Sequence, residues 1–392
     1  MRTRDPEWVD FDEPEYSRRI SRAREAMKAH DLDALFLTQY KNVYYFSGYL
    51  NAVPAIASDQ VCAAIIKRDG TTRLLDMEWT RNIAEETSWI RSHTFFSGIQ
   101  AKKQNVLEVL SRTFSEMGLK GARIGAEFGE KQSVRLPTEI LLDLLKSGPD
   151  LVDGAPALWD CRMVKSELEV DRVRQAARIA SRALDRAFAE ARVGMTEVEF
   201  SRRLGQLIME EGADVPTWMI VSSGRRLGPK IAGAYPVERK LRRGDYLQVD
   251  LGATFHRYTS DVCRMAYVGG APPRADSDLW DVYAEADRKG TRAVRPGVRA
   301  SSVYQAITDV FEEAGYRFTF DTGGHGLGLD GHEPPNLGPG DETVIRPGMV
   351  FSIEPDGVAN KDGVAFTCED NIVCTEGGSE RLSTLGWDLV QI

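Results

Sequence analysis

Residues 246–268 read YLQVDLGATFHRYTSDVCRMAYV. Two runs in this stretch, 246–253 and 258–268, are rich in the apolar and aromatic residues that favour strands and alternate them with polar ones. The four residues between the runs, Thr254 to Arg257, are short enough for a hairpin loop. The sequence therefore predicts an antiparallel pair of strands.

Two carboxylates fall opposite each other in this predicted hairpin. A four-residue loop pairs Asp250 with Asp261, and it turns Leu247, Val249 and Leu251 toward the other face. Like charges directly opposed in a sheet are destabilising, so we expect a shared cation between the two aspartates. The alternative interpretation places one of them at a turn or a strand edge.

Residues 323–332 read GGHGLGLDGH, so glycines flank His325 on both sides and allow the backbone to approach a ligand closely. A G-x-G pattern also occurs in dinucleotide-binding loops. Pro334 and Pro335 disfavour that function here, because they follow where a phosphate-binding helix would begin. His325 is therefore a candidate metal ligand, with a turn residue as the alternative.

Two glutamates lie in apolar stretches. Glu354 ends the run 349–355 (MVFSIEP), and Glu369 is expected inside a strand over 365–375 (AFTCEDNIVCT). A glutamate is costly to bury unless it is paired or bound to a metal. The candidate metal ligands are therefore four carboxylates and one imidazole: Asp250, Asp261, His325, Glu354 and Glu369.

Four neighbouring carboxylates raise one another's pKa, and two divalent ions would balance their charge. An oxygen-rich set with one imidazole and no thiolate suits Mn, Co, Fe or Zn. Two such ions can activate a water and polarise a carbonyl. We therefore expect hydrolysis of an amide-like bond.

The composition is that of an ordinary globular chain of 392 residues, with 42% apolar residues and a net charge of −9. The acidic balance argues against nucleic acid or an anionic membrane as a partner. No apolar run approaches the ~18 residues of a membrane span, and the charged residues 1–12 do not resemble a signal peptide. The five scattered cysteines indicate reduced thiols and a cytoplasmic location.

The length suggests two domains. Residues 148–157 are rich in Gly, Pro and Asp, so we expect the domains to be 1–157 and 158–392. The second domain should open with two helices, because Ser166 with Glu169 and Thr196 with Glu199 each form a capping box.

The sequence resembles a known family. The order of the five candidate ligands and the strings DLGA, HGLGLDGHE, RPGMVFSIEP and ED (369–370) are similar to the pita-bread metallopeptidases, which include prolidase, aminopeptidase P and methionine aminopeptidase. The string NVYYFSGY (42–49) resembles the creatinase/prolidase N-terminal domain. The resemblance implies an α+β pita-bread catalytic domain preceded by a smaller α/β domain.

The same resemblance implies a centre of two divalent ions, with Mn favoured, and a homodimer. It assigns Glu354 a second role as proton acceptor for the nucleophilic water. It also implies that His332 contacts the substrate and stabilises the tetrahedral intermediate.

Three positions depart from the prolidase-like pattern. The upstream histidine of such members is replaced by Gly233, beside Tyr235; the arginine before the last glutamate ligand is Thr367; and the histidine before the metal histidine is Asp321. Tyr235, Asp321 and Thr367 are therefore candidate substrate contacts. Without the arginine we expect weak cleavage of Xaa-Pro dipeptides, because their free carboxylate would need a positive charge.

Several functions remain open. The first is an Xaa-Pro peptidase of dipeptidase or aminopeptidase P type, acting on a short peptide. A second is a non-peptidase that acts on a small nitrogen compound, similar to creatinase or ectoine hydrolase. A dimethylsulfoniopropionate lyase is a third, although members of that branch carry an aspartate at the position of Gly252. A non-catalytic binding protein on the same fold is disfavoured, because all five candidate ligands are present.

Overall fold

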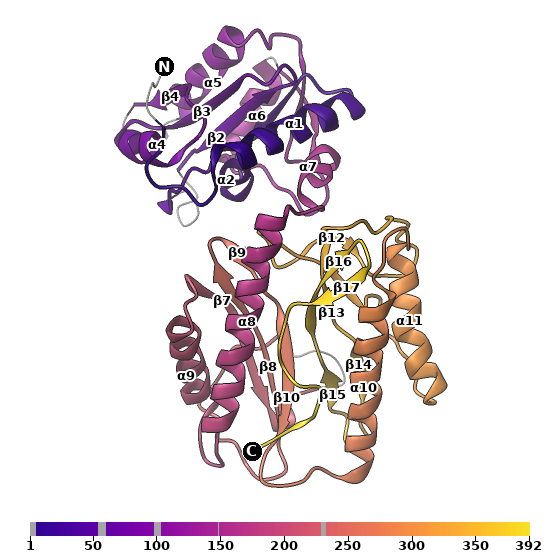
Figure 1. The fold of residues 1–392 in the computed structure, drawn as a ribbon. Coiled ribbons are helices and arrows are strands. Elements are labelled where there is room, and N and C mark those ends of the chain that lie inside the picture. Colours follow the sequence, from indigo (N-terminus) through magenta and orange to yellow (C-terminus); the bar gives the residue numbers. More distant parts are fainter. Residues whose placement is uncertain (1–4, 54–59, 98–102, 148, 229–232) are drawn as a thin grey trace. The chain divides into compact units, whose positions relative to one another are not determined.

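The computed structural model describes residues 5–53, 60–97, 103–147, 149–228 and 233–392. The chain forms two compact units, Met1–Arg162 and Met163–Ile392, called here the N-terminal and C-terminal units (Figure 1). The expected boundary between residues 157 and 158 falls inside helix α7 (Ala155–Arg162) of the N-terminal unit. The division of the chain into two independently folding domains at residues 157 and 158 stays a prediction.

The N-terminal unit is built on one mixed sheet with helices around it, as an α/β domain should be. Its strands lie in the order β4 (His93–Phe96), β3 (Thr72–Met77), β2 (Ala63–Lys67), β1 (Ala34–Leu37), β5 (Arg123–Ala126) and β6 (Asp150–Asp153). The other elements are α1 (Glu13–Ala29), α2 (Tyr40–Ser47), η1 (Glu78–Thr80), α4 (Arg81–Thr87), α5 (Lys103–Glu116), α6 (Thr138–Ser147) and α7.

Hydrophobic runs explain the centre of this sheet. All four residues of β1 are buried, and Phe36 packs with Ile65 of β2 and Leu110 of α5 in one core. The aromatic string that follows β1 forms helix α2, which ends at Gly48 in the left-handed conformation (φ 73°) that glycine adopts without strain.

The C-terminal unit contains two main sheets, each packed against a pair of helices (Figure 1). The first sheet has the order β18 (Val390–Gln391), β10 (Val262–Tyr267), β8 (Tyr246–Phe255), β7 (Val215–Ser223), and β9 (Tyr258–Thr259) pairs with β8. Helices α8 (Glu167–Glu190) and α9 (Glu197–Glu210) pack on it, and η2 (Gly224–Arg226) follows β7. Both predicted capping boxes are present at the starts of α8 and α9.

The second sheet has the order β12 (Glu333–Asn336), β11 (Gly324–Gly326), β13 (Val350–Ile353), β16 (Asp370–Thr375), β17 (Gly378–Arg381). Helix α10 (Arg274–Ala293) packs on it, and α11 (Ala300–Glu313) packs on α10. A separate hairpin joins β14 (Asp356–Ala359) to β15 (Ala365–Thr367).

The predicted hairpin over residues 246–268 forms, but its register is not the expected one. The turn contains only His256 and Arg257, both with positive φ (45° and 72°) as in a type I′ turn. Strand β8 therefore continues to Phe255, and Asp250 pairs with Cys263 rather than with Asp261. The direct pairing of the two aspartates was wrong because the shorter turn shifts the register.

The two faces of β8 do separate as expected. Leu247, Val249, Leu251 and Ala253 lie in the core beneath α8 and α9, whereas Asp250 lines a cavity on the opposite side. The alternation along this one strand therefore divides the core from the candidate site.

All five cysteines are buried and free. Within the described residues, no helix combines the length and the apolar character needed to cross a membrane.

A buried ionic network joins β10 to β16. Arg264 is 1% exposed and donates to both oxygens of Asp370, at 3.0 and 2.9 Å. It also donates to the carbonyl oxygens of Cys263 and Glu369, each at 2.8 Å. Arg381 contacts Asp370 as well, so this carboxylate compensates two guanidinium groups.

Replacing Arg264 should destabilise the C-terminal unit strongly. Arg264→Met leaves the buried Asp370 with one cationic partner fewer, and breaking a buried pair costs about 3–5 kcal/mol. Arg274→Met is the matched control, since Arg274 pairs with Asp278 on the exposed surface, and it should leave the stability almost unchanged. Urea unfolding measures both variants, and equal midpoints would contradict the prediction.

Candidate metal centre

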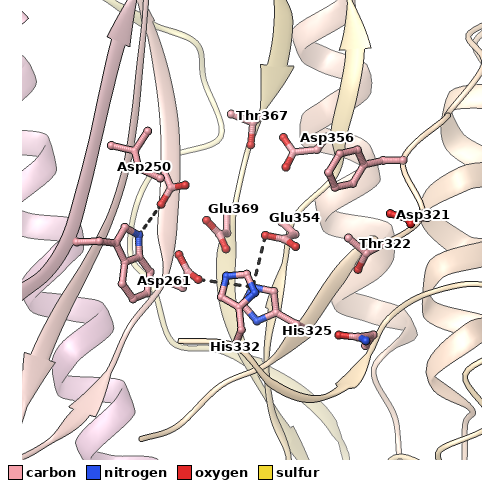
Figure 2. A pocket seen from close by; sticks show the side chains of 14 residues that line it. Asp250, Asp261, Asp321, Thr322, His325, His332, Glu354, Asp356, Thr367 and Glu369 are labelled. Atoms are coloured by element: carbon pink, nitrogen blue, oxygen red, sulfur yellow. Dashed lines mark hydrogen bonds and ion pairs between the residues drawn. The ribbon is translucent and has the colours of Figure 1, made fainter. Parts of the chain in front are cut away.

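The C-terminal unit contains a cavity of about 530 Å³. Its wall includes all five predicted ligands, together with His332, Asp321 and Thr367 (Figure 2). The cavity therefore brings together every predicted site residue except Tyr235. That side chain is 88% exposed and does not line the cavity.

Asp250 is held in place by a neighbouring strand. The indole Nε1 of Trp218, on β7, donates to Oδ1 of Asp250 at 2.8 Å. Burial raises the pKa of Asp250 to about 6, and the charge of Glu354 adds to that effect.

Glycines make room for this indole. A Cβ on Gly252 would lie 2.8 Å from the Trp218 ring and 2.8 Å from the Ser260 carbonyl oxygen, and a Cβ on Gly331 would also lie 2.8 Å from the ring. Real Cβ atoms essentially never approach so closely. This packing disfavours the aspartate that a lyase of the superfamily carries at position 252.

Asp261 lies in the short gap between β9 and β10, and its backbone is fixed from the second sheet. Its N–H donates to Oδ1 of Asn371 at 3.0 Å, and the Asn371 amide donates back to its carbonyl oxygen. Burial, together with the charges of Asp250 and Glu354, raises the pKa of Asp261 well above its usual value.

Glu369 links β15 to β16 rather than lying inside one strand, as the sequence had suggested. It forms an isolated bridge with Cys263 on the first sheet. Ser352 donates to its Oε1 at 2.6 Å. Burial and the charge of Asp261 raise the pKa of Glu369 well above the usual value.

His325 lies on β11 and presents Nε2 to the carboxylates. This atom is 3.6 Å from Oδ2 of Asp261 and 3.6 Å from Oε2 of Glu354 (Figure 2). Its Nδ1 is 3.0 Å from the carbonyl oxygen of Gly326. Because a carbonyl only accepts, Nδ1 carries a proton, and the neutral form of the ring would offer the lone pair of Nε2 to a metal.

Glu354 follows the end of β13 and has a different electrostatic environment from the other carboxylates. Burial acts to raise its pKa, but the charge and hydrogen bond of His325, with the charge of His332, outweigh burial and lower it. Glu354 is therefore the carboxylate of the centre that ionises most readily.

The loop that carries His332 is anchored by a buried ion pair. Glu333 and Lys165 are 2.9 Å apart, with side chains 1% and 2% exposed. Glu333 also accepts from the backbone of Leu329 and Asp330, at 3.0 and 3.2 Å. This anchoring fixes the loop so that the ring of His332 stacks on that of His325, with centroids 3.8 Å apart.

The donor atoms fit divalent cations. They form overlapping groups of three, and within each group the atoms lie within 4.8 Å of one another: Asp250, Asp261 and Glu369; His325, Glu354 and Glu369; Asp261, His325 and His332. Glu369 belongs to the two groups that consist of predicted ligands. Its carboxylate would therefore help to hold a cation in either group.

Other residues of the cavity were not predicted from the sequence. Trp218 gave no signal, because its role depends on the pairing of β7 with β8. The position of Asp356 in the sequence does indicate a place in the site. This residue lies two positions beyond Glu354, so strand alternation would place both carboxylates on the same side, and both do line the cavity.

Removing the indole hydrogen bond should weaken metal binding. Trp218→Phe leaves Asp250 without its donor, and loss of a group that orients a ligand typically costs 10–100-fold in metal affinity. Trp79→Phe is the control, since Trp79 is 47% exposed in the N-terminal unit. Competition with a chromophoric chelator measures both affinities, and an unchanged Trp218→Phe value would contradict the assigned role.

The chain is similar to known peptidases over nearly its whole length. The curated Xaa-Pro dipeptidase of Pyrococcus horikoshii is 28% identical over 95% of this chain and 98% of its own length. The crystal structure of dipeptidase PepE from Mycobacterium ulcerans superposes with a TM-score of 0.83 at 27% identity, covering 97% and 99% of the two chains. The prolidase structure from P. horikoshii gives 0.79 at 27% identity, covering 94% and 99%.

Two family models match the sequence. The creatinase/prolidase N-terminal domain covers residues 19–164, and metallopeptidase family M24 covers residues 171–376. The predicted pita-bread fold is thereby confirmed, and the family implies divalent metal ions at the centre. Because the second match spans more than half of the chain, the protein belongs to metallopeptidase family M24.

Proposed function

We propose that the chain is a hydrolase with a dinuclear metal centre that cleaves amide-type C–N bonds as Xaa-Pro peptidases do. The observation that carries the proposal is the pair of ligand groups that share Glu369. The names of the full-length relatives, Xaa-Pro dipeptidase and prolidase, support the choice of bond.

Each side chain has a role that its surroundings support. When bound, two divalent ions would activate a water molecule and polarise the substrate carbonyl. Glu354 accepts the proton of the attacking water, since its lowered pKa keeps it ionised near neutral pH. His332 donates a hydrogen bond to the oxygen on which negative charge develops. Asp250, Asp261, His325 and Glu369 complete the ligand set.

The finer assignments belong to the same proposal. Manganese is the favoured metal, because the set is rich in oxygen and contains no thiolate. Asp321 and Thr367 contact the substrate from the cavity wall. Tyr235 would contribute only after a rearrangement, because it is exposed. We further propose a cytoplasmic homodimer.

One observation favours a second candidate, a hydrolase of a small nitrogen compound. No described residue lining the cavity is a lysine or an arginine. The free carboxylate of an Xaa-Pro dipeptide therefore finds no lysine or arginine side chain among the described lining residues.

A substrate panel tests the function. Manganese-loaded protein is assayed on Xaa-Pro dipeptides, longer Xaa-Pro peptides and small cyclic amides, with chelator-treated protein as the control. We expect chelator-sensitive cleavage of longer Xaa-Pro peptides and weaker cleavage of the dipeptides. Absence of hydrolysis throughout the panel, with both ions bound, would refute the proposal.

Metal removal should lower stability, and more so at pH 7 than at pH 5. In the metal-free native state the pKa of Asp250 is about 6, and the pKa values of Asp261 and Glu369 are raised well above their usual range. These groups therefore hold protons that the unfolded chain releases near pH 4. Stability of the metal-free protein therefore falls as the pH rises above that value. Bound metal contributes about 2.7 kcal/mol when its free concentration is ~100 times the dissociation constant. Calorimetric melting at both pH values measures the difference, and coincident curves at pH 7 would contradict a bound metal centre.

Glu354→Gln should impair turnover far more than folding. Glutamine keeps the size of the side chain but cannot accept the proton, and loss of a general base costs about 10²–10⁴ in rate. Steady-state kinetics on protein with verified metal content give the comparison. Near-wild-type turnover with both ions present would remove the assigned role.

A further inference from the structure

Two carboxylates in the cavity are not used by the proposed metal centre. The four ligand carboxylates balance two divalent ions, which leaves Asp321 and Asp356 uncompensated. No lysine or arginine lies in the described lining to pair with them, and burial together with the charge of Glu354 raises the pKa of Asp356 well above its usual value, as expected for a carboxylate without a cationic partner.

Asp356 is the more constrained of the two. It is 2% exposed, and it pairs with Thr367 across the β14–β15 hairpin. The Thr367 hydroxyl donates a hydrogen bond to the Asp356 carboxylate. The Oδ1 atom of Asp356, however, is buried and has no hydrogen-bond partner among the described residues. Figure 2 shows the carboxylate turned into the cavity, between Thr367 and Glu354. A buried carboxylate oxygen without a donor is costly, so a ligand with N–H groups would complete this site.

The backbone around Asp356 is fixed. The hydroxyl of Tyr283 donates to the carbonyl oxygen of Val358 and accepts from its N–H, both at 2.7 Å. A Cβ on Gly357 would lie 3.3 Å from the ring of Phe320, so that ring also packs close to the strand. The contacts of Tyr283 and Phe320 hold strand β14 in place. They therefore oppose a shift of the strand that would bring the Asp356 carboxylate to another hydrogen-bond donor.

We propose that Asp356 binds a cationic nitrogen, a guanidinium or an ammonium group, that the substrate carries beside the C–N bond to be cleaved. The inference rests on the proposed hydrolase function and specifies its substrate class. Such a group supplies both a positive charge and the missing N–H donors. The exposed Asp321 on the same cavity wall attracts the same charge.

A binding experiment without turnover tests this assignment. Methylguanidinium and methylurea have nearly the same size and shape but differ in charge, and titration calorimetry on manganese-loaded protein measures both. We expect the wild type to bind the cation at least about ten-fold more tightly, as a hydrogen bond to a charged group allows. Asp356→Asn should abolish this preference and leave methylurea binding unchanged. Asp362→Asn, an exposed position in the turn of the same hairpin, is the matched control.

Metal content and melting temperature are measured for every protein. Equal binding of the two probes by the wild type would overturn the proposal, and this result does not depend on any variant folding. A preference that survives in Asp356→Asn would overturn it too, as would loss of a metal ion from that variant, which would make Asp356 a ligand. Because no catalysis is measured, failure here leaves the hydrolytic function standing. If the protein prefers the cationic probe but cleaves no peptide, only the proposed hydrolytic function is contradicted.

Discussion

Mutual repulsion among buried carboxylates is the constraint on which the C-terminal unit depends. Asp250, Asp261 and Glu369 all have raised pKa values because burial and their neighbours' charges penalise ionisation. A fold driven only by apolar burial would keep such groups apart. Compensating cations would allow these groups to ionise together, and much of the surrounding structure serves to hold them in position.

The supporting groups come from both sheets. Trp218 orients Asp250 from the first sheet, whereas Ser352 and Asn371 fix Glu369 and the backbone of Asp261 from the second. Beneath them, Arg264 ties the carbonyl oxygens of Cys263 and Glu369 together. None of these residues is a proposed ligand, but each restricts the position of one. The site is thereby preorganised for metal binding.

The sequence predicted which residues come together in the cavity better than it predicted their local geometry. A carboxylate within an apolar strand is a strong signal, because only pairing or a metal makes its burial tolerable. Register was harder, since a turn with positive φ at His256 and Arg257 is not obvious from those residue types. The part played by Trp218 was not predictable, because it depends on strands whose pairing joins distant parts of the chain. Asp356 was not among the predicted site residues, although strand alternation from Glu354 places it on the same side.

The proposed ligands are divided between the two helix-backed sheets: Asp250 lies on the first, and His325 lies on the second. An ion held by both halves would act as a cross-link, and local separation of the halves would promote its release. Metal exchange is then a kinetic measure of how often the C-terminal unit opens. Dissociation rates and the hydrogen exchange of strands β8 and β13 should consequently respond together to temperature and denaturant, as two records of one opening motion.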